Sequence, residues 1–150
     1  MKLDRRWWVA IGVAVVAAVA LVLQYTVFDR PSEECRPVKE LLDFNRSQGE
    51  QIASKTGDEQ GIPTAAEETA YQAWADGLAE RAQEVNSPDL ATTATTVAGL
   101  ANEFVGKLSI VRAQAESRAP GAPAPPAAYE MMALNARISE NLDELAKACS

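Results

Sequence analysis

A single uncharged segment near the N-terminus constrains this chain more than any other feature. Trp7 to Phe28 is a run of 22 residues without a charged side chain, rich in alanine, valine and leucine. As a helix rising about 1.5 Å per residue it would span roughly 33 Å, enough to cross a hydrocarbon core of about 30 Å. Because a bilayer offers the backbone no hydrogen-bonding partners, a crossing segment must be helical. The sequence therefore predicts one transmembrane helix over residues 7–28.

The charges that flank this segment predict its orientation. Residues 1–6 carry three basic side chains and one acid, whereas acids outnumber bases just after the segment. Since basic flanks stay inside, we expect residues 1–6 in the cytoplasm and residues 29–150 outside it, at the cell membrane. A cleaved secretory signal peptide is the alternative, because Ala18-Val19-Ala20 matches a small-x-small cleavage site. The uncharged run continues well past that site, which favours an uncleaved anchor.

The predicted membrane helix has one face of small residues. Ala10, Ala14 and Ala18 recur at intervals of four. Small residues at this spacing let a second helix approach closely within the bilayer, so these three alanines form a candidate intramembrane packing face. The alternative is chance, since the whole chain is rich in alanine. We therefore expect the membrane, and a membrane-protein partner, as the partners of residues 7–28.

Composition excludes several classes of function. Residues 29–150 hold 20 acidic and 11 basic residues, and this negative balance opposes binding to nucleic acid or to anionic lipid surfaces. The chain has no histidine, which removes the commonest general base and metal ligand. Carboxylates occur as adjacent pairs, such as Glu33/Glu34 and Glu67/Glu68, whose side chains diverge by about 100° on a helix. We expect no catalytic residue, no metal site and no cofactor.

Two cysteines, Cys35 and Cys149, stand near the two ends of the segment predicted to lie outside the cytoplasm. Disulfides persist in that compartment, so the favoured interpretation is an intramolecular bond between the two cysteines. An intermolecular bond and free thiols are the alternatives. Redox catalysis is not expected, because the two cysteines lack the C-x-x-C spacing that tunes a thiolate.

Periodic apolar residues at intervals of three and four predict four amphipathic helices, over residues 36–55, 64–85, 88–116 and 127–148. Thr64 and Glu67 have the spacing of a capping box at a helix start. Ser87 suits the next N-cap and Pro88 the first helical position. The Pro/Ala-rich stretch 119–128 is expected to be a semi-rigid connector.

Together these features predict an all-α protein: one N-terminal transmembrane helix followed by an extracytoplasmic, antiparallel four-helix bundle closed by a disulfide. In that topology the start of the first bundle helix and the end of the fourth lie at one end. Cys35 and Cys149 would therefore meet, next to the membrane. This agreement between orientation, periodicity and cysteine placement supports the architecture more than any one of them.

Five further residues of the predicted bundle are candidates for its interior. Tyr71, Trp74 and Phe104 are expected in the core, with a ligand pocket between the helices as the alternative. Asn45 and Asn135 occupy heptad-like positions on the first and fourth helices. A buried asparagine pair can set helix register, but we expect each at the edge of its apolar stripe, in water.

The sequence favours a non-catalytic function. A single anchor, a helical domain and no catalytic motif are typical of an accessory or scaffold subunit of a larger membrane complex. The Ala/Pro/Arg bias favours a bacterial source. The alternative is an extracytoplasmic ligand-binding or sensory module, which would signal through a partner because residues 1–6 are too short for an output domain.

Overall fold

The computed structural model describes residues 32–55, 64–119 and 121–150 of the 150-residue chain. Glu33–Ser150 form one compact unit, and its described part is helical with no strand. Its four helices each begin and end within two residues of the ranges expected from the sequence, and they are α2 (Arg36–Lys55), α3 (Ala65–Gln83), α4 (Pro88–Glu116) and α5 (Pro126–Ala148).

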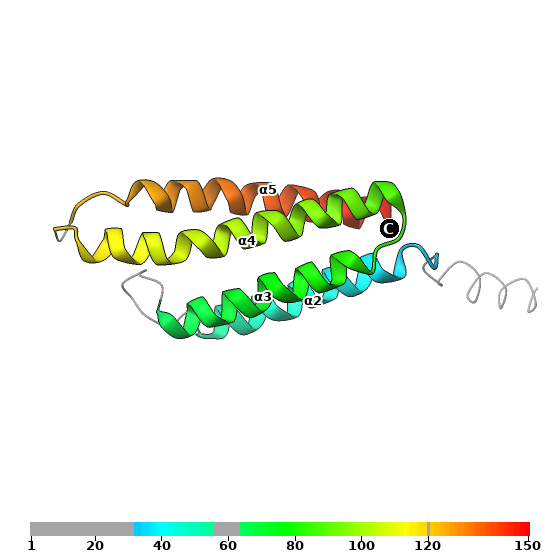
Figure 1. The fold of residues 1–150 in the computed structure, drawn as a ribbon, viewed down its shortest axis with the longest axis horizontal. Helices are drawn as coiled ribbons and strands as arrows, with labels where there is room; N and C mark the ends of the chain where they lie inside the picture. Colours follow the sequence, from blue (N-terminus) through cyan, green and yellow to red (C-terminus); the bar gives the residue numbers. More distant parts are fainter. Residues whose placement is uncertain (1–31, 56–63, 120) are drawn as a thin grey trace, which may run out of the picture. The chain divides into compact units, whose positions relative to one another are not determined.

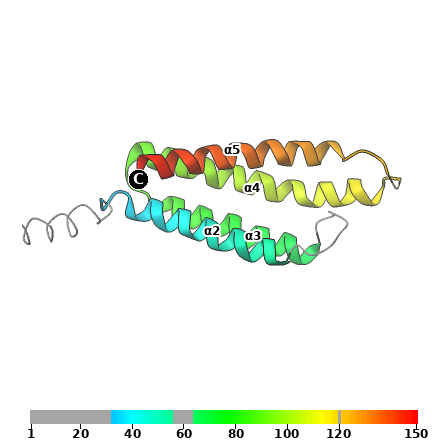
Figure 2. The ribbon, with the colours of Figure 1, turned by 180° about the vertical axis from the view of Figure 1, so that it is seen from behind.

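The helices of this unit run alternately up and down, so that each lies antiparallel to the next (Figures 1 and 2). α3 packs against both α2 and α4, and α5 packs against α4. α2 and α5 complete the ring, but they share far fewer contacts than the other neighbouring pairs. The unit is therefore an antiparallel four-helix bundle with one sparsely packed seam.

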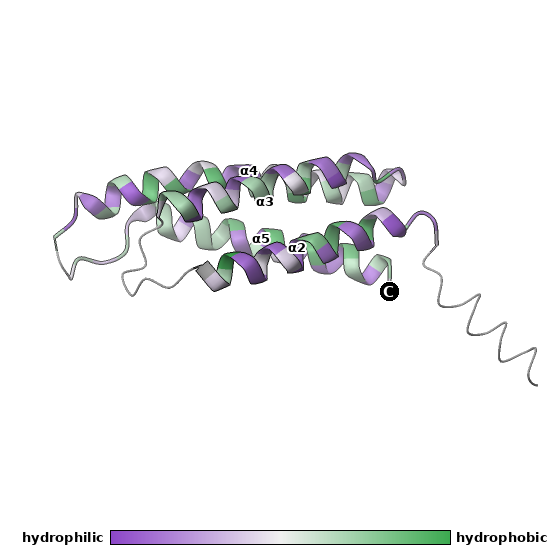
Figure 3. Ribbon diagram, turned by 90° about the horizontal axis from the view of Figure 1, so that it is seen from below, coloured by the Kyte–Doolittle hydropathy of each residue, from purple (hydrophilic) through white to green (hydrophobic). Residues whose placement is uncertain are grey.

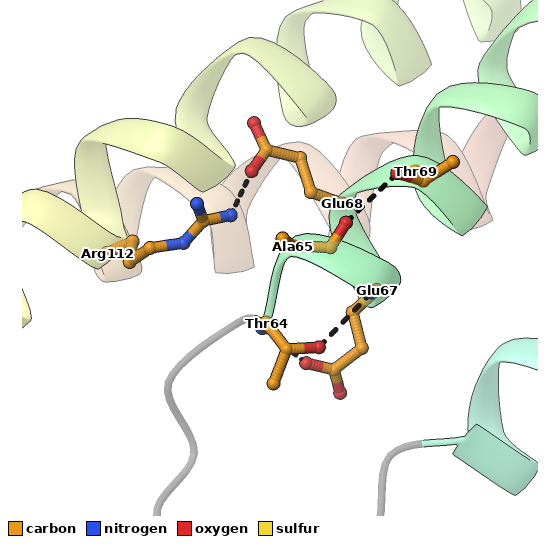
Figure 4. Close-up of polar contacts among 6 residues, drawn as sticks. All are labelled: Thr64, Ala65, Glu67, Glu68, Thr69 and Arg112. Carbon is orange, nitrogen blue, oxygen red and sulfur yellow. Dashed lines mark hydrogen bonds and ion pairs between the residues drawn. The ribbon is translucent and has the colours of Figure 1, made fainter.

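Residues at the helix N-termini specify where α3 and α4 begin, and most of them take the capping or first-turn positions expected from the sequence. At α3, the Glu67 amide donates to Thr64 Oγ1 (3.2 Å) while the Thr64 amide donates to Glu67 Oε2 (2.6 Å), a complete capping box (Figure 4). At α4, Pro88 occupies the first turn as expected. Ser87 stands at the N-cap position, but its hydroxyl makes no capping hydrogen bond, so its predicted capping role is wrong.

The expected connector 119–128 is shorter than predicted, because α5 already begins at Pro126. Proline suits a first helical turn, where its missing N–H would have no partner in any case. Gly121 lies in the connector with a φ of 83°, in the left-handed region that favours glycine. The connection between α4 and α5 therefore turns at a glycine and ends at a proline.

Apolar side chains from all four helices form a single core. Each helix carries hydrophilic and hydrophobic residues along its length (Figure 3). Six large side chains are almost completely buried, and each contributes about 1.5–3 kcal/mol to folding; they are Val38, Leu41, Leu78, Val97, Leu108 and Leu145. Small residues, including Ala75, Ala94 and Ala101, fill the α3–α4 side of the core, where they allow the helices to lie close together.

Ion pairs link α4 to both of its neighbours. Arg112 pairs with Glu68 of α3 (Figure 4), and Lys107 pairs with Glu130 of α5. Each of these four side chains is at least a quarter exposed. Such pairs contribute about 0.2–1 kcal/mol each, so they add to a fold that the core determines.

α2 and α3 are joined by an unusually close contact. The Phe44 ring lies directly against Gly77, where even a methyl group would overlap it. The Arg81 guanidinium lies 3.8 Å from the centre of the Phe44 ring, and Arg81 Nη1 donates to the Gly77 carbonyl at 3.0 Å. The glycine thus lets the two helices approach, with the tip of the ring against it, and the arginine lies over the ring as a cation–π partner.

The predicted disulfide is confirmed. Cys35, just before α2, is bonded to Cys149 at the end of α5, with their Cα atoms 5.4 Å apart and a sequence separation of 114. Both side chains are largely buried. The bond links the first and last helices of the bundle, as the up-and-down topology requires.

The predicted transmembrane helix over 7–28 lies outside the described residues, and so do Ala10, Ala14 and Ala18. Among the helices that the structure does describe, none has the length and apolar character needed to cross a bilayer. The anchor, its orientation and the extracytoplasmic location of residues 29–150 therefore stay predictions from sequence.

Candidate functional site

Three aromatic side chains from α3 and α4 meet inside the bundle. The ring centroids of Tyr71 and Phe104 are 5.4 Å apart, and those of Trp74 lie 6.2 Å from Tyr71 and 6.1 Å from Phe104. Trp74 meets both partners nearly edge-on, which is a favourable arrangement for aromatic pairs. Trp74 is only 8% exposed, whereas Tyr71 and Phe104 are half-buried. The three aromatic residues that the sequence predicted for the core, or for a pocket, thus lie side by side in the structure.

Asn45 holds the indole of this aromatic cluster in place. Trp74 Nε1 donates a hydrogen bond to Asn45 Oδ1 at 2.9 Å, which joins α3 to α2. Asn45 is half-buried, so the expectation that it lies at a stripe edge in water is wrong. Asn135 on α5 is exposed, in agreement with that expectation. The two asparagines therefore differ in role and do not form a buried pair.

The aromatic cluster forms the floor of an open groove between α2 and α5. One part of the groove, about 330 Å³, is bounded by α2 and α5 and reaches Tyr71, Trp74 and Phe104. A second part, about 490 Å³, continues beyond α2 along the first half of α5, where its described lining comes from α3, α4 and α5. Both parts share three residues, Tyr71, Phe104 and Asn135. We call these two adjoining parts, with all the residues that line them, the α2–α5 groove.

The groove arises where the apolar stripes of α2 and α5 are interrupted. Asn45 and Gly49 of α2 line the groove at positions from which bulky apolar side chains would reach toward α5. Asn135 and Ser139 of α5 occupy the corresponding positions facing α2. Small and polar side chains at these four positions leave the space between the helices unfilled. Neither Gly49 nor Ser139 was predicted as a site residue, although the break in two facing apolar stripes was the signal that could have revealed them.

Tyr71 is a titratable side chain of the groove lining, and its surroundings favour the neutral form. Burial raises the pKa of its hydroxyl above the ordinary 10.0, and the nearby Glu67 carboxylate raises it further. Tyr71 therefore stays protonated at neutral pH and can both donate and accept a hydrogen bond. Its hydroxyl is a neutral polar group on an otherwise aromatic floor.

The carboxylates singled out in the sequence have structural surroundings. Glu67 completes the capping box and Glu68 pairs with Arg112, while Glu33 and Glu34 are exposed before α2. Across the described part of the chain, no three His, Cys, Asp or Glu side chains gather closely enough to hold a metal ion. The arrangement that the bundle does offer is a recess for non-covalent binding.

Other proteins offer no further guide to the use of this groove. Comparison of the chain with known protein families, with curated proteins and with solved structures finds no match.

Proposed function

We propose that this chain is a single-pass, membrane-anchored interaction protein, a non-catalytic accessory or scaffold subunit of a larger bacterial membrane complex. The uncharged segment 7–28 supports the anchor, and its flanking charges support a helical domain outside the cytoplasm. The disulfide agrees with that location, because such bonds persist in oxidising compartments.

The observation that carries this proposal is an exposed apolar pair on α5. Tyr129 is 59% exposed and Met132 is 69% exposed. Residues three apart are neighbours on a helix surface, so the two side chains form one patch; we call it the α5 patch. Aromatic residues and methionine are enriched at protein interfaces, and two exposed side chains of these types side by side suit such a contact. The occupant we propose is a helix of a membrane-protein partner.

Co-purification tests the α5 patch. The full-length chain is purified from its native membrane in mild detergent, and the co-purifying proteins are identified by mass spectrometry. We expect a membrane-protein partner with the wild type and its loss in Tyr129→Glu/Met132→Glu, because two charges oppose burial of the patch. Ser109→Glu/Ala113→Glu is the matched control, since it adds the same charges at exposed positions one turn apart on α4. A wild type without a partner, or equal capture by the patch variant, would contradict the proposal.

The predicted anchor face is a second candidate contact. Replacing Ala10, Ala14 and Ala18 by leucine would prevent close approach of a helix within the bilayer. If the complex survives in this variant, the segment serves as a tether alone, and the α5 patch carries the contact.

A second function is favoured by the α2–α5 groove: an extracytoplasmic ligand-binding module that signals through a partner. Its volume lies within the range of small-molecule sites, roughly 300–1,000 Å³. A ligand that binds only the folded state would raise the melting temperature in a thermal-shift screen.

A further inference from the structure

We propose that the α2–α5 groove is a binding site for a neutral aromatic small molecule. This goes beyond the interaction function, because the groove and the α5 patch share only Met132. The proposal commits to the charge and the shape of the ligand, and both follow from the residues that line the groove.

The composition of the lining disfavours anions. Among the residues that the structure describes, no Lys, Arg, Asp or Glu side chain lines either part of the groove. A bound carboxylate or phosphate group would leave water without gaining a counter-charge, which is costly. The acidic balance of residues 29–150 further opposes anions. A neutral molecule meets neither penalty.

The aromatic floor favours a flat apolar body and disfavours a cation. A cage for an organic cation needs ring faces held apart around it. Here the three rings pack against one another, with all centroids within 6.2 Å, so no cation fits among them. The half-buried rings of Tyr71 and Phe104 instead offer a surface on which another ring can pack. The hydrogen bond from Trp74 to Asn45 holds this surface rigid before a ligand arrives.

A few neutral polar groups stand around the floor and can orient a ligand. They are the Tyr71 hydroxyl on the floor and the Asn135 amide and Ser139 hydroxyl on α5. Each can donate or accept a hydrogen bond. The combination of an apolar surface and a small number of polar groups is typical of small-molecule sites. A ring bearing a hydroxyl or amide group matches it.

Methionine methyl groups provide a readout that is independent of function. The chain has three methionines, and two of them, Met131 and Met132, line the groove. The full-length chain, labelled at the methionine methyl groups and held in nanodiscs, is titrated with three probes on one naphthalene skeleton: naphthol, naphthalene sulfonate and naphthylmethylammonium. Met131→Leu and Met132→Leu assign the two resonances. Partition of a probe into lipid produces no saturable shift of these methyl groups.

We expect saturable shifts of Met131 and Met132 with naphthol, and at least tenfold weaker binding of both charged probes. Asn135→Phe should abolish the naphthol shifts, because position 135 lines both parts of the groove. Ala133→Phe is the matched control, since it places the same ring at an exposed position outside the lining and should bind as the wild type does.

Tyr71→Phe keeps the proposal testable if Asn135→Phe does not fold, because it removes a single hydroxyl group and leaves the aromatic floor of the groove in place. The loss of one hydrogen bond should weaken naphthol binding by about 2- to 12-fold. The proposal is overturned if naphthol gives no saturable shift, if either charged probe binds as tightly, or if folded Asn135→Phe binds like the wild type. Loss of partner capture in Tyr129→Glu, at a position of the α5 patch outside the groove lining, with naphthol binding intact would separate this site from the proposed interaction function.

Discussion

Helix α2 meets its two neighbours in opposite ways. Toward α3 it makes a close, shape-specific contact, in which Phe44 lies on Gly77 under Arg81 and Asn45 accepts a hydrogen bond from Trp74. Toward α5, the disulfide joins the two helices at one end of the bundle. Further along the helices, the groove lies between them in place of packed side chains. One seam is therefore joined by complementary side chains and the other by a covalent bond.

This contrast shows how a small bundle can keep a recess open without losing its fold. An unfilled seam gives up packing energy, because its side chains lack partners on one side. A cross-link offsets part of that loss by restricting the unfolded chain, and it does so without filling the groove. The bond lies at this seam because the topology brings the ends of α2 and α5 together, and its effect on the unfolded chain stabilises the whole bundle.

The largest expected effect comes from breaking the covalent seam. Cys35→Ser/Cys149→Ser removes a bond between residues 114 positions apart, and loop-closure entropy then lowers the free energy of unfolding by about 4–5 kcal/mol. We expect the melting temperature of the full-length chain in detergent to fall by roughly 15–20 °C. Far-UV circular dichroism measures it, after mass spectrometry has verified the intact bond in the wild type. Equal stability of the two proteins would show that the bond contributes nothing to this seam.

The next effect concerns the packed seam. Asn45→Leu leaves the Trp74 N–H, on a side chain only 8% exposed, without its acceptor. The free energy of unfolding should fall by about 1–3 kcal/mol, the cost of an unsatisfied buried donor. In the Trp74→Phe background the same change should cost much less, since no donor remains. Denaturant titration of the four proteins of this cycle measures the coupling, and independent effects would show that the hydrogen bond does not hold the seam.

Replacing either of two helix glycines by alanine should change the free energy of unfolding by a smaller amount, and the two changes should have opposite signs. Gly77→Ala places a methyl group where the Phe44 ring lies, so the ring must move, and we expect a net loss of about 1–2 kcal/mol. Gly106→Ala meets open space on α4 and should stabilise the protein by about 0.5–1 kcal/mol through helix propensity. Thermal unfolding of both variants checks the signs. Stabilisation by Gly77→Ala equal to that of Gly106→Ala would mean that the contact is not close.

These seams also show which parts of the structure the sequence could predict. The start of α3 follows from Thr64 and Glu67 alone, because a capping box is local. The disulfide follows from two cysteines and an even number of helices, because topology brings their ends together. Helix ranges were predictable for the same reason: periodicity and caps act within a few residues.

The candidate site was predictable only in part. Tyr71, Trp74 and Phe104 share the interior because each lies on an apolar stripe, but whether they face a core or a recess depends on the distance between α2 and α5. Small side chains on both helices, Gly49 and Ser139, line the recess, and bringing them opposite one another requires the register between α2 and α5. The contact of Phe44 with Gly77 likewise needs the relative register of two helices, which no single helix specifies.

The smallest predicted effect tests the groove through the ionisation of Tyr71. Burial, and secondarily Glu67, raises the pKa of Tyr71 above 10.0 in the folded protein, so the unfolded chain loses this proton first as pH rises. The resulting stability is fully present below pH 10.0 and is lost as pH rises through the higher folded-state pKa. Lys107 acts in the same direction, because its hydrogen bond to Glu130 raises its pKa.

Both Tyr71→Phe and the matched control Tyr129→Phe keep Lys107, so the comparison isolates the contribution of the tyrosine. Melting temperatures between pH 8 and pH 11 should fall less steeply in Tyr71→Phe than in the wild type, whereas Tyr129→Phe, at a largely exposed position, should follow the wild type. An unchanged slope in Tyr71→Phe would mean that the hydroxyl lies in water, and that the groove floor is wetter than its aromatic lining indicates.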